Sequence, residues 1–139
     1  SYQGKNQDQL ETYTNTISSG QLQYTDSITA LSFAWNAQQE LSWLLGSGSP
    51  MDHGDDVFAV TGTSSGTSSA GIAYEIIISL PLRNDFSCKW IPLGLQDMST
   101  PTLLVSSGQI DFIASDSCSN YLEFVFDGNP FYTKLDSFQ

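Results

Sequence analysis

The sequence has little charge, and positive charge is the scarcest. Only four residues are Lys or Arg, against fifteen Asp and Glu, which gives a net charge of −11. Nucleic acids and anionic membranes are bound through clustered Lys and Arg, so we predict no nucleic-acid partner, and anionic membranes are disfavoured likewise. No apolar run approaches the ~18 residues that a membrane-spanning helix needs.

Cysteine is also scarce, with only Cys88 and Cys118 present. A metal site would need three or four ligands, whereas a surface built from Ser, Thr, Asn and Gln is typical of exported proteins, in which two cysteines pair. We therefore predict a Cys88–Cys118 disulfide and an extracellular location. Two buried free thiols in a cytosolic protein are the alternative. Closing such a loop stabilises a fold by about 3–4 kcal/mol in the chain-entropy model.

The most extended pattern lies at the start of the chain. Apolar residues recur there at helical spacing, at Leu10, Tyr13, Ile17, Tyr24, Ile28, Leu31 and Trp35. This period predicts a helical third, residues 1–46. The residues between are mediocre helix formers, and Gly20 interrupts them. Either one helix runs to Leu45, or two helices cover residues 5–19 and 26–45.

From residue 57 onward the pattern changes to strands. Strict alternation predicts strands over 72–80, ended by Pro81, and over 121–126, which leads through an Asp-Gly turn into a closing hairpin with 131–135. Shorter strands are predicted at 57–60, 88–95, 102–105 and 110–114, with 61–71 as a flexible loop. With 40% apolar residues in 139, we predict one domain, 1–139. Its predicted class is α+β: an N-terminal helix, unbroken or broken near Gly20, packed on an antiparallel meander of five to seven strands with one disulfide.

Candidate chemistry is sparse. The one histidine, His53, lies among Asp52, Asp55 and Asp56, and these three carboxylates form a weak candidate site for a hard cation such as Ca²⁺. A solvated acidic loop is the favoured interpretation. No nucleophile elbow or phosphate-binding loop is present. We therefore predict no catalytic residues, no cofactor and no enzymatic activity.

The three tryptophans allow two interpretations. Trp35 and Trp43 fall near one face of the predicted helix, so packing in the core is favoured for both. Trp90 lies beside Cys88, and packing on the predicted disulfide is favoured for it as well. It is also the candidate aromatic for stacking on a ligand such as a sugar.

The predicted layout resembles the globular part of a type IV pilin or a type II secretion pseudopilin. The opening "SYQ" resembles the Ala/Ser-Tyr/Phe-Gln that follows the hydrophobic half of a pilin helix, and "YLEFVFDGNPF" is similar to the strand-turn ending of minor pilins. The resemblance implies a disulfide-stabilised pilus or pseudopilus subunit. Leu10, Tyr13 and Ile17 would pack against other pilin subunits.

On that interpretation, residues 1–46 form part of the stalk. Residues 57–139 form an acidic head that meets subunits or a host or abiotic surface, and the membrane is contacted only through a missing N-terminal segment. The alternative hypothesis is a secreted carbohydrate- or protein-binding domain, similar to an adhesin or lectin.

Overall fold

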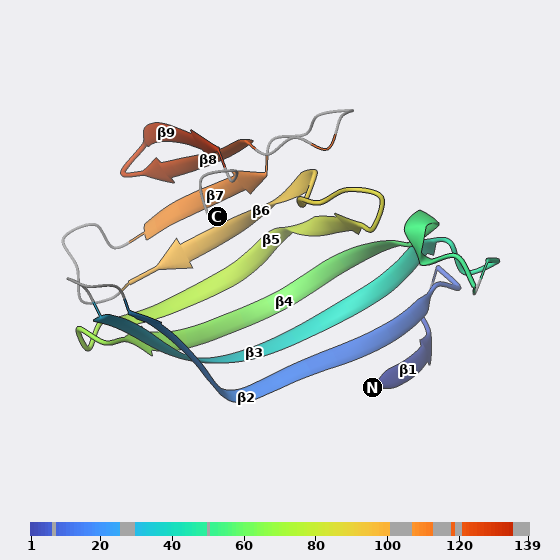
Figure 1. The fold of residues 1–139 in the computed structure, drawn as a ribbon, viewed down its shortest axis with the longest axis horizontal. Coiled ribbons are helices and arrows are strands. Elements are labelled where there is room, and N and C mark those ends of the chain that lie inside the picture. The colour runs from blue at the N-terminus through green and yellow to red at the C-terminus, as the bar shows by residue number, and fades with distance from the viewer. Residues whose placement is uncertain are drawn as a thin grey trace.

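The computed structural model describes residues 1–6, 8–25, 30–49, 51–100, 107–112, 118 and 121–134. These residues form nine strands and one short 3-10 helix, η1 (His53–Asp55). The strands are β1 (Tyr2–Lys5), β2 (Glu11–Thr25), β3 (Ala30–Leu45), β4 (Val57–Ser68), β5 (Ala73–Asp85), β6 (Leu93–Ser99), β7 (Ser107–Phe112), β8 (Tyr121–Phe126) and β9 (Asn129–Lys134). All nine belong to one curved antiparallel sheet, in which each strand pairs with the next in chain order (Figure 1).

The predicted α+β class and its N-terminal helix are wrong. The stretch read as helical contains β2 and β3, which pair with each other from Thr12 opposite Ser42 to Thr25 opposite Ala30. The pilin resemblance is wrong for the same reason, because a pilin-like fold needs an N-terminal helix packed on the sheet. The division into a helical stalk and a separate sheet also fails, since β3 pairs with β4 along most of its length. Residues 26–29 lie outside the described part.

A β-bulge explains the misleading period in β2. Tyr13 and Ile17 lie on one face of the strand because their spacing of four is a multiple of two. Ser18 and Ser19 together then oppose Asn36 on β3, and Ser19 has a φ of 57°. The extra residue reverses the alternation, so Leu22 lies on the same face as Ile17 although the two are five residues apart. Apolar residues on one face of the strand therefore follow each other at both even and odd spacings, as they do on one face of a helix.

Two other predicted boundaries need correction. Strand β4 begins at Val57 as predicted but runs to Ser68, so most of the predicted loop at 61–71 is strand. Strand β5 continues beyond Pro81 to Asp85. Proline is tolerated there because its pairing with β6 is irregular between Leu80 and Arg83, so no regular ladder bond is lost.

The end of the chain follows the sequence pattern closely. Strand β8 occupies the predicted residues 121–126, and β7 overlaps the predicted 110–114. Asp127 and Gly128 have φ values of 48° and 76°, which suits a tight hairpin turn to β9. Of the predicted strand at 88–95, only residues 93–95 are strand, at the start of β6, so its first five residues were predicted wrongly. The predicted strand at 131–135 overlaps β9, and residue 135 lies outside the described residues. The predicted strand at 102–105 lies outside the described residues.

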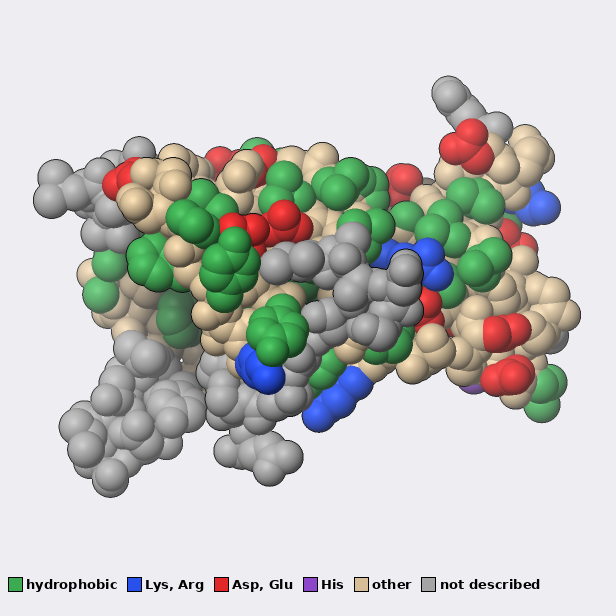
Figure 2. Space-filling model, turned by 90° about the horizontal axis from the view of Figure 1, so that it is seen from above, with side chains coloured by type: hydrophobic (Ala, Val, Ile, Leu, Met, Phe, Trp, Pro, Cys, Tyr) green, Lys and Arg blue, Asp and Glu red, His purple; other side chains and the backbone are tan. Residues whose placement is uncertain are grey.

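Little of this sheet is buried. Among the described residues, the buried hydrophobic side chains are Ala37, Val57, Leu82 and Leu122, and no large side chain is fully buried. Seen from the β8–β9 side, hydrophobic side chains reach the surface between polar ones (Figure 2). The described part therefore has a sheet but no second layer to cover it.

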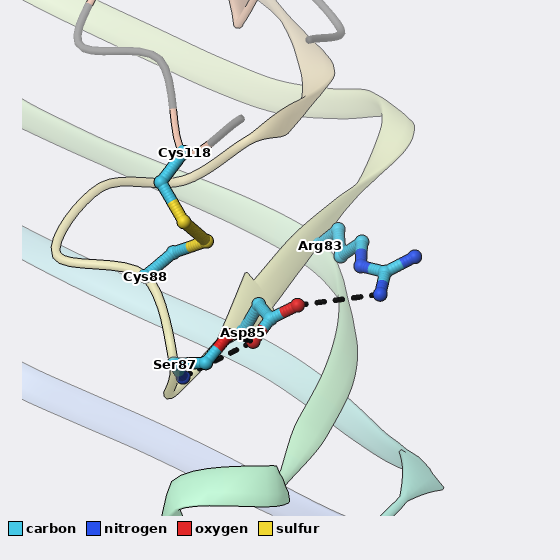
Figure 3. The surroundings of a disulfide bond; sticks show 5 residues. All are labelled: Arg83, Asp85, Ser87, Cys88 and Cys118. Carbon is cyan, nitrogen blue, oxygen red and sulfur yellow. Dashed lines mark hydrogen bonds and ion pairs between the residues drawn. A yellow bond between two sulfur atoms is a disulfide. The ribbon is translucent and has the colours of Figure 1, made fainter. Parts of the chain in front are cut away.

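The predicted disulfide is confirmed. Cys88 and Cys118 are bonded, with their Cα atoms 5.2 Å apart, and they link the segment after β5 to the residue range before β8 (Figure 3). Beside the bridge, Asp85 accepts hydrogen bonds from the hydroxyl and backbone N–H of Ser87 and from Arg83. The Ser87 hydroxyl bond is the main reason that the pKa of Asp85 is lowered from its usual value. These bonds fix the turn that carries Cys88.

Candidate binding face

The strand register divides the sheet into two chemically different sides. Residues opposite each other on paired strands share a side, and successive residues alternate between sides. We call the side that carries Trp43, Phe58 and Phe124 the apolar face and the opposite side the polar face. The apolar side chains of the apolar face include Tyr2, Tyr13, Ile17, Leu22, Phe33, Trp35, Ala37, Leu41, Trp43, Phe58, Val60, Tyr74, Ile76, Ile78, Leu82, Met98, Ile110, Phe112, Leu122, Phe124, Phe126 and Phe131.

Charge is segregated to the polar face. The carboxylates in the interior of the described strands all lie there, and they are Glu40, Glu75, Asp97, Asp111 and Glu123. Hydroxyl groups accompany them, because β2 and β4 place alternate threonines and serines on the same side. Glu11 and its strand partner Lys5 are the charged residues of the apolar side, and they lie at the β1 edge. The described interior of the apolar face is therefore uncharged.

The apolar face has no covering layer among the described residues. The strands contact chiefly their neighbours in the sheet. Leu22 and Phe131 on this face remain 56% and 57% exposed. A sheet with one apolar face is stable in water when another layer covers that face, because exposed apolar area costs about 25 cal/mol per Å². The apolar face is thus suited to binding a second layer that removes its side chains from water.

One end of the apolar face carries a continuous row of aromatic rings. We call Tyr2, Tyr13, Trp43, Phe58 and Phe86 the aromatic row. Successive ring centroids lie 5.4, 6.4, 5.4 and 5.7 Å apart, from β1 across β2, β3 and β4 to the turn after β5. The outer members, Tyr2 and Phe86, are 58% and 52% exposed. The rings stabilise one another, and they leave apolar surface at both ends.

A buried aspartate, Asp56, holds two members of this row, one through its carboxylate and one through its backbone. Asp56 is 3% exposed, and its Oδ1 accepts a hydrogen bond of 3.2 Å from the indole Nε1 of Trp43. Its backbone carbonyl accepts a bond of 2.9 Å from the N–H of Phe86. His53 Nδ1 lies 3.1 Å from the other carboxylate oxygen. Asp56 therefore ties the loop after β3 to both Trp43 and Phe86.

The proposed cation site does not assemble. The Asp52 side chain caps η1 by accepting from the N–H of Gly54, and Asp55 accepts from the hydroxyl of Ser49. Asp56 instead faces Trp43. Within the described ranges, no group of three His, Cys, Asp or Glu side chains could hold a metal ion. Each of the three carboxylates has a separate structural use.

The other predicted site residues are placed as follows. Tyr13 and Ile17, from the proposed assembly stripe, do lie together on the apolar face, although on a strand. Leu10 precedes β2, where its N–H bonds to the side chain of Asn6. Trp90 lies in the segment before β6, with the Lys89 ammonium 4.7 Å from its ring centroid. The stripe is thus part of a much larger face that the sequence analysis missed.

Aromatic rings also lie over glycines on this face. Three such cross-strand pairs occur: Gly20 with Trp35, Gly66 with Tyr74, and Gly108 with Phe126. A methyl group at Gly66 would lie 2.6 Å from the Tyr74 hydroxyl oxygen, and closer still to the backbone carbonyl of Ala34. The absence of a side chain lets each ring pack down on the backbone of the neighbouring strand.

Replacing Gly66 by alanine should therefore destabilise the protein. We expect Gly66→Ala to lower the free energy of unfolding by about 2 kcal/mol, because the backbone carbonyl of Ala34 has little room to move away from a new methyl group. Urea denaturation measures this loss. Gly48→Ala is the control, since a methyl group there would meet open space, and it should be nearly neutral. Equal effects of the two substitutions would contradict the role of ring-on-glycine packing.

The polar face has a hollow of its own. It measures about 420 Å³ and is lined by residues that include Ile77, Asp97, Gln109 and Val125. The side-chain amide of Gln109 donates to Asp97 at 2.7 Å, so these two polar groups bond to each other. The hollow is therefore a weaker candidate for a binding site than the apolar face.

Among the described residues, no helix has the length and apolarity to cross a membrane. Comparison with protein-family models, with curated proteins and with solved structures finds no match to this chain.

Proposed function

We propose that this chain is a non-catalytic protein of the extracellular space that docks to other proteins through its apolar face. The observation that carries the proposal is the separation of the two sides of the sheet: aromatic and aliphatic side chains gather on one, and carboxylates on the other. The Cys88–Cys118 disulfide supports an oxidising compartment. The partner surface should be apolar and weakly charged, to match the apolar face.

A protein partner fits the apolar face better than a carbohydrate. Sugars stack on aromatic rings but also need polar groups close by that bond to their hydroxyls. Polar side chains are a minority on this face, and two of them, Asn15 and Gln39, use their amides to bond to each other. Members of the aromatic row also contact one another. Protein interfaces, by contrast, are rich in Tyr, Trp, Phe and Met with charge excluded from their centres.

Binding of a neutral apolar dye tests the availability of this face. Nile red suits the purpose because the net charge of −11 does not repel it. At nanomolar protein, where weak assemblies dissociate, we expect wild-type protein to bind Nile red with enhanced, blue-shifted emission. Ile76 and Ile77 are adjacent residues of β5 on opposite faces, paired with Met98 and Asp97 respectively. Ile76→Ser should lower the emission of bound dye about twofold or more, because it removes apolar area from the binding face.

The matched control is Ile77→Ser, which removes the same side chain from the polar face and should leave dye binding close to wild type. Dye binding that Ile77→Ser reduces as strongly as Ile76→Ser would refute the assignment of the face. Wild-type protein that binds no dye at any dilution would refute docking through an exposed apolar face.

A further inference from the structure

We infer that the partner on the apolar face is a second copy of this chain, so that two sheets stack face to face about a two-fold axis. The inference rests on the proposed docking function and names its partner. Two sheets packed in this way lie about 10 Å apart and interdigitate their inner side chains. A two-fold contact requires a self-complementary surface, in which the same patch serves both subunits. The apolar face meets that requirement because its interior carries no charge, and its charged residues, Glu11 and Lys5, lie at the β1 edge.

The width of the sheet argues for another sheet as its cover. Eight strand spacings of about 4.8 Å make the described sheet roughly 38 Å wide. A single helix, about 10 Å across, would cover only a quarter of that width. The four longest strands, β2 to β5, have 15, 16, 12 and 13 residues. They alone offer roughly 800 Å² of face, which is what each partner contributes to a stable interface of standard size.

The distribution of charge favours stacking in this orientation. Face-to-face stacking directs Glu40, Glu75 and Asp97 of both copies outward into water, on the far sides of the two sheets. It also brings Trp35 and Trp43 of each copy into the interface, where large aromatic side chains contribute most to binding. Stacking through the polar faces would oppose carboxylates to carboxylates, which is unfavourable for two chains of charge −11.

The edges of the sheet do not favour assembly by strand addition. Edge strand β1 has only four residues, and its register to β2 shifts between Tyr2 and Gly4. Edge strand β9 contains Pro130 and ends in Lys134. Short edges, bulges, proline and lysine all oppose pairing with another strand. The apolar face is therefore the better surface for self-association.

Sedimentation equilibrium of the purified full chain tests the inference. We expect the wild-type mass to rise with concentration to twice the 15.2 kDa of one chain and no further. Ile76→Lys should raise the dissociation constant about 100-fold or more, because it buries an unpaired ammonium group in the contact. Ile77→Lys, one residue away on the polar face, should leave the dissociation constant near wild type. Far-UV circular dichroism checks that both variants keep the strand signal.

A second measurement needs no substitution. Because Trp35 and Trp43 lie on the apolar face, diluting the wild-type protein through dissociation should shift tryptophan emission to the red in step with the fall in mass. Dimerisation abolished by Ile77→Lys but kept by Ile76→Lys would overturn the inference, as would assemblies larger than a dimer.

A wild-type chain that stays monomeric at every concentration would also overturn the inference. In that outcome, Nile red binding by the monomer still supports docking to a different protein, whereas its absence removes the docking proposal as well. The two failures are thus distinguishable.

Discussion

Substituting Asp56 by alanine should lower the free energy of unfolding by about 2–3 kcal/mol, a large effect for a change in a loop. The carboxylate is 3% exposed and is the partner of Trp43 Nε1. Alanine leaves that donor without its acceptor and leaves a small cavity beside the indole. Loss of the His53 contact should add little, because the His53 side chain is 73% exposed.

Two variants separate these contributions. Asp56→Asn keeps an oxygen that can accept from Trp43 and loses only the charge, so its cost should be smaller than that of alanine. Asp55→Ala is the matched control, because it removes a neighbouring carboxylate that is exposed and accepts a hydrogen bond from the Ser49 hydroxyl. Denaturation in urea gives the free energies, and tryptophan emission should shift to the red for Asp56→Ala alone.

Equal destabilisation by Asp55→Ala and Asp56→Ala would contradict the role assigned to the buried carboxylate. So would a loss of stability in Asp56→Ala without any change in tryptophan emission. The first result would indicate a general effect of loop charge on stability. The second would show that Asp56 stabilises the protein without fixing the position of Trp43.

Alternation with period two predicted the strands whose two faces differ most clearly. In 121–126 every second residue is Leu or Phe, and the following Asp-Gly pair adopts the left-handed backbone that a tight hairpin needs. The disulfide was predictable because only one pairing of two cysteines exists within the chain. These predictions required only local information.

The N-terminal strands were misread because local spacing is ambiguous. Steps of four, such as Tyr13 to Ile17, suit both a helix and a strand. The bulge at Ser18 and Ser19 then supplied an odd step, which imitates the mixed steps of three and four in a helix. The high content of Thr and Tyr in β2, residues that favour strands, was the signal that pointed the other way.

The apolar face could not be derived from the sequence, because only the register between paired strands brings its side chains together. Phe58 and Trp43 lie side by side only because β3 and β4 pair as they do, and Phe86 joins them from a turn. The polar side chains and glycines of 61–68 also hid a strand, in which Thr61, Thr63, Ser65 and Thr67 lie on the polar face and Gly66 lies under the ring of Tyr74. Tertiary pairing thus outweighed composition in that segment.

Removing the disulfide should have the largest effect on stability, and the effect should be local. The bridge spans 30 residues that include β6 and β7. In the chain-entropy model, losing it costs about 3–4 kcal/mol. Because each strand contacts chiefly its neighbours, opening can start at the β9 edge without disturbing distant strands. We therefore expect amide hydrogen exchange in β6 to β9 to accelerate in the Cys88→Ala/Cys118→Ala double variant.

Exchange in β2 and β3 is the internal reference for this prediction. These strands are long, are paired on both sides and lie away from the bridge in the order of the sheet. Their protection should fall less than that of β6 to β9, which separates local opening from global unfolding. Wild-type protein in a reductant should reproduce the pattern, since Cys118 is exposed to solvent. Equal acceleration in all strands would show that the sheet unfolds as one unit, and unchanged exchange in β6 to β9 would show that the bridge does not hold the C-terminal half.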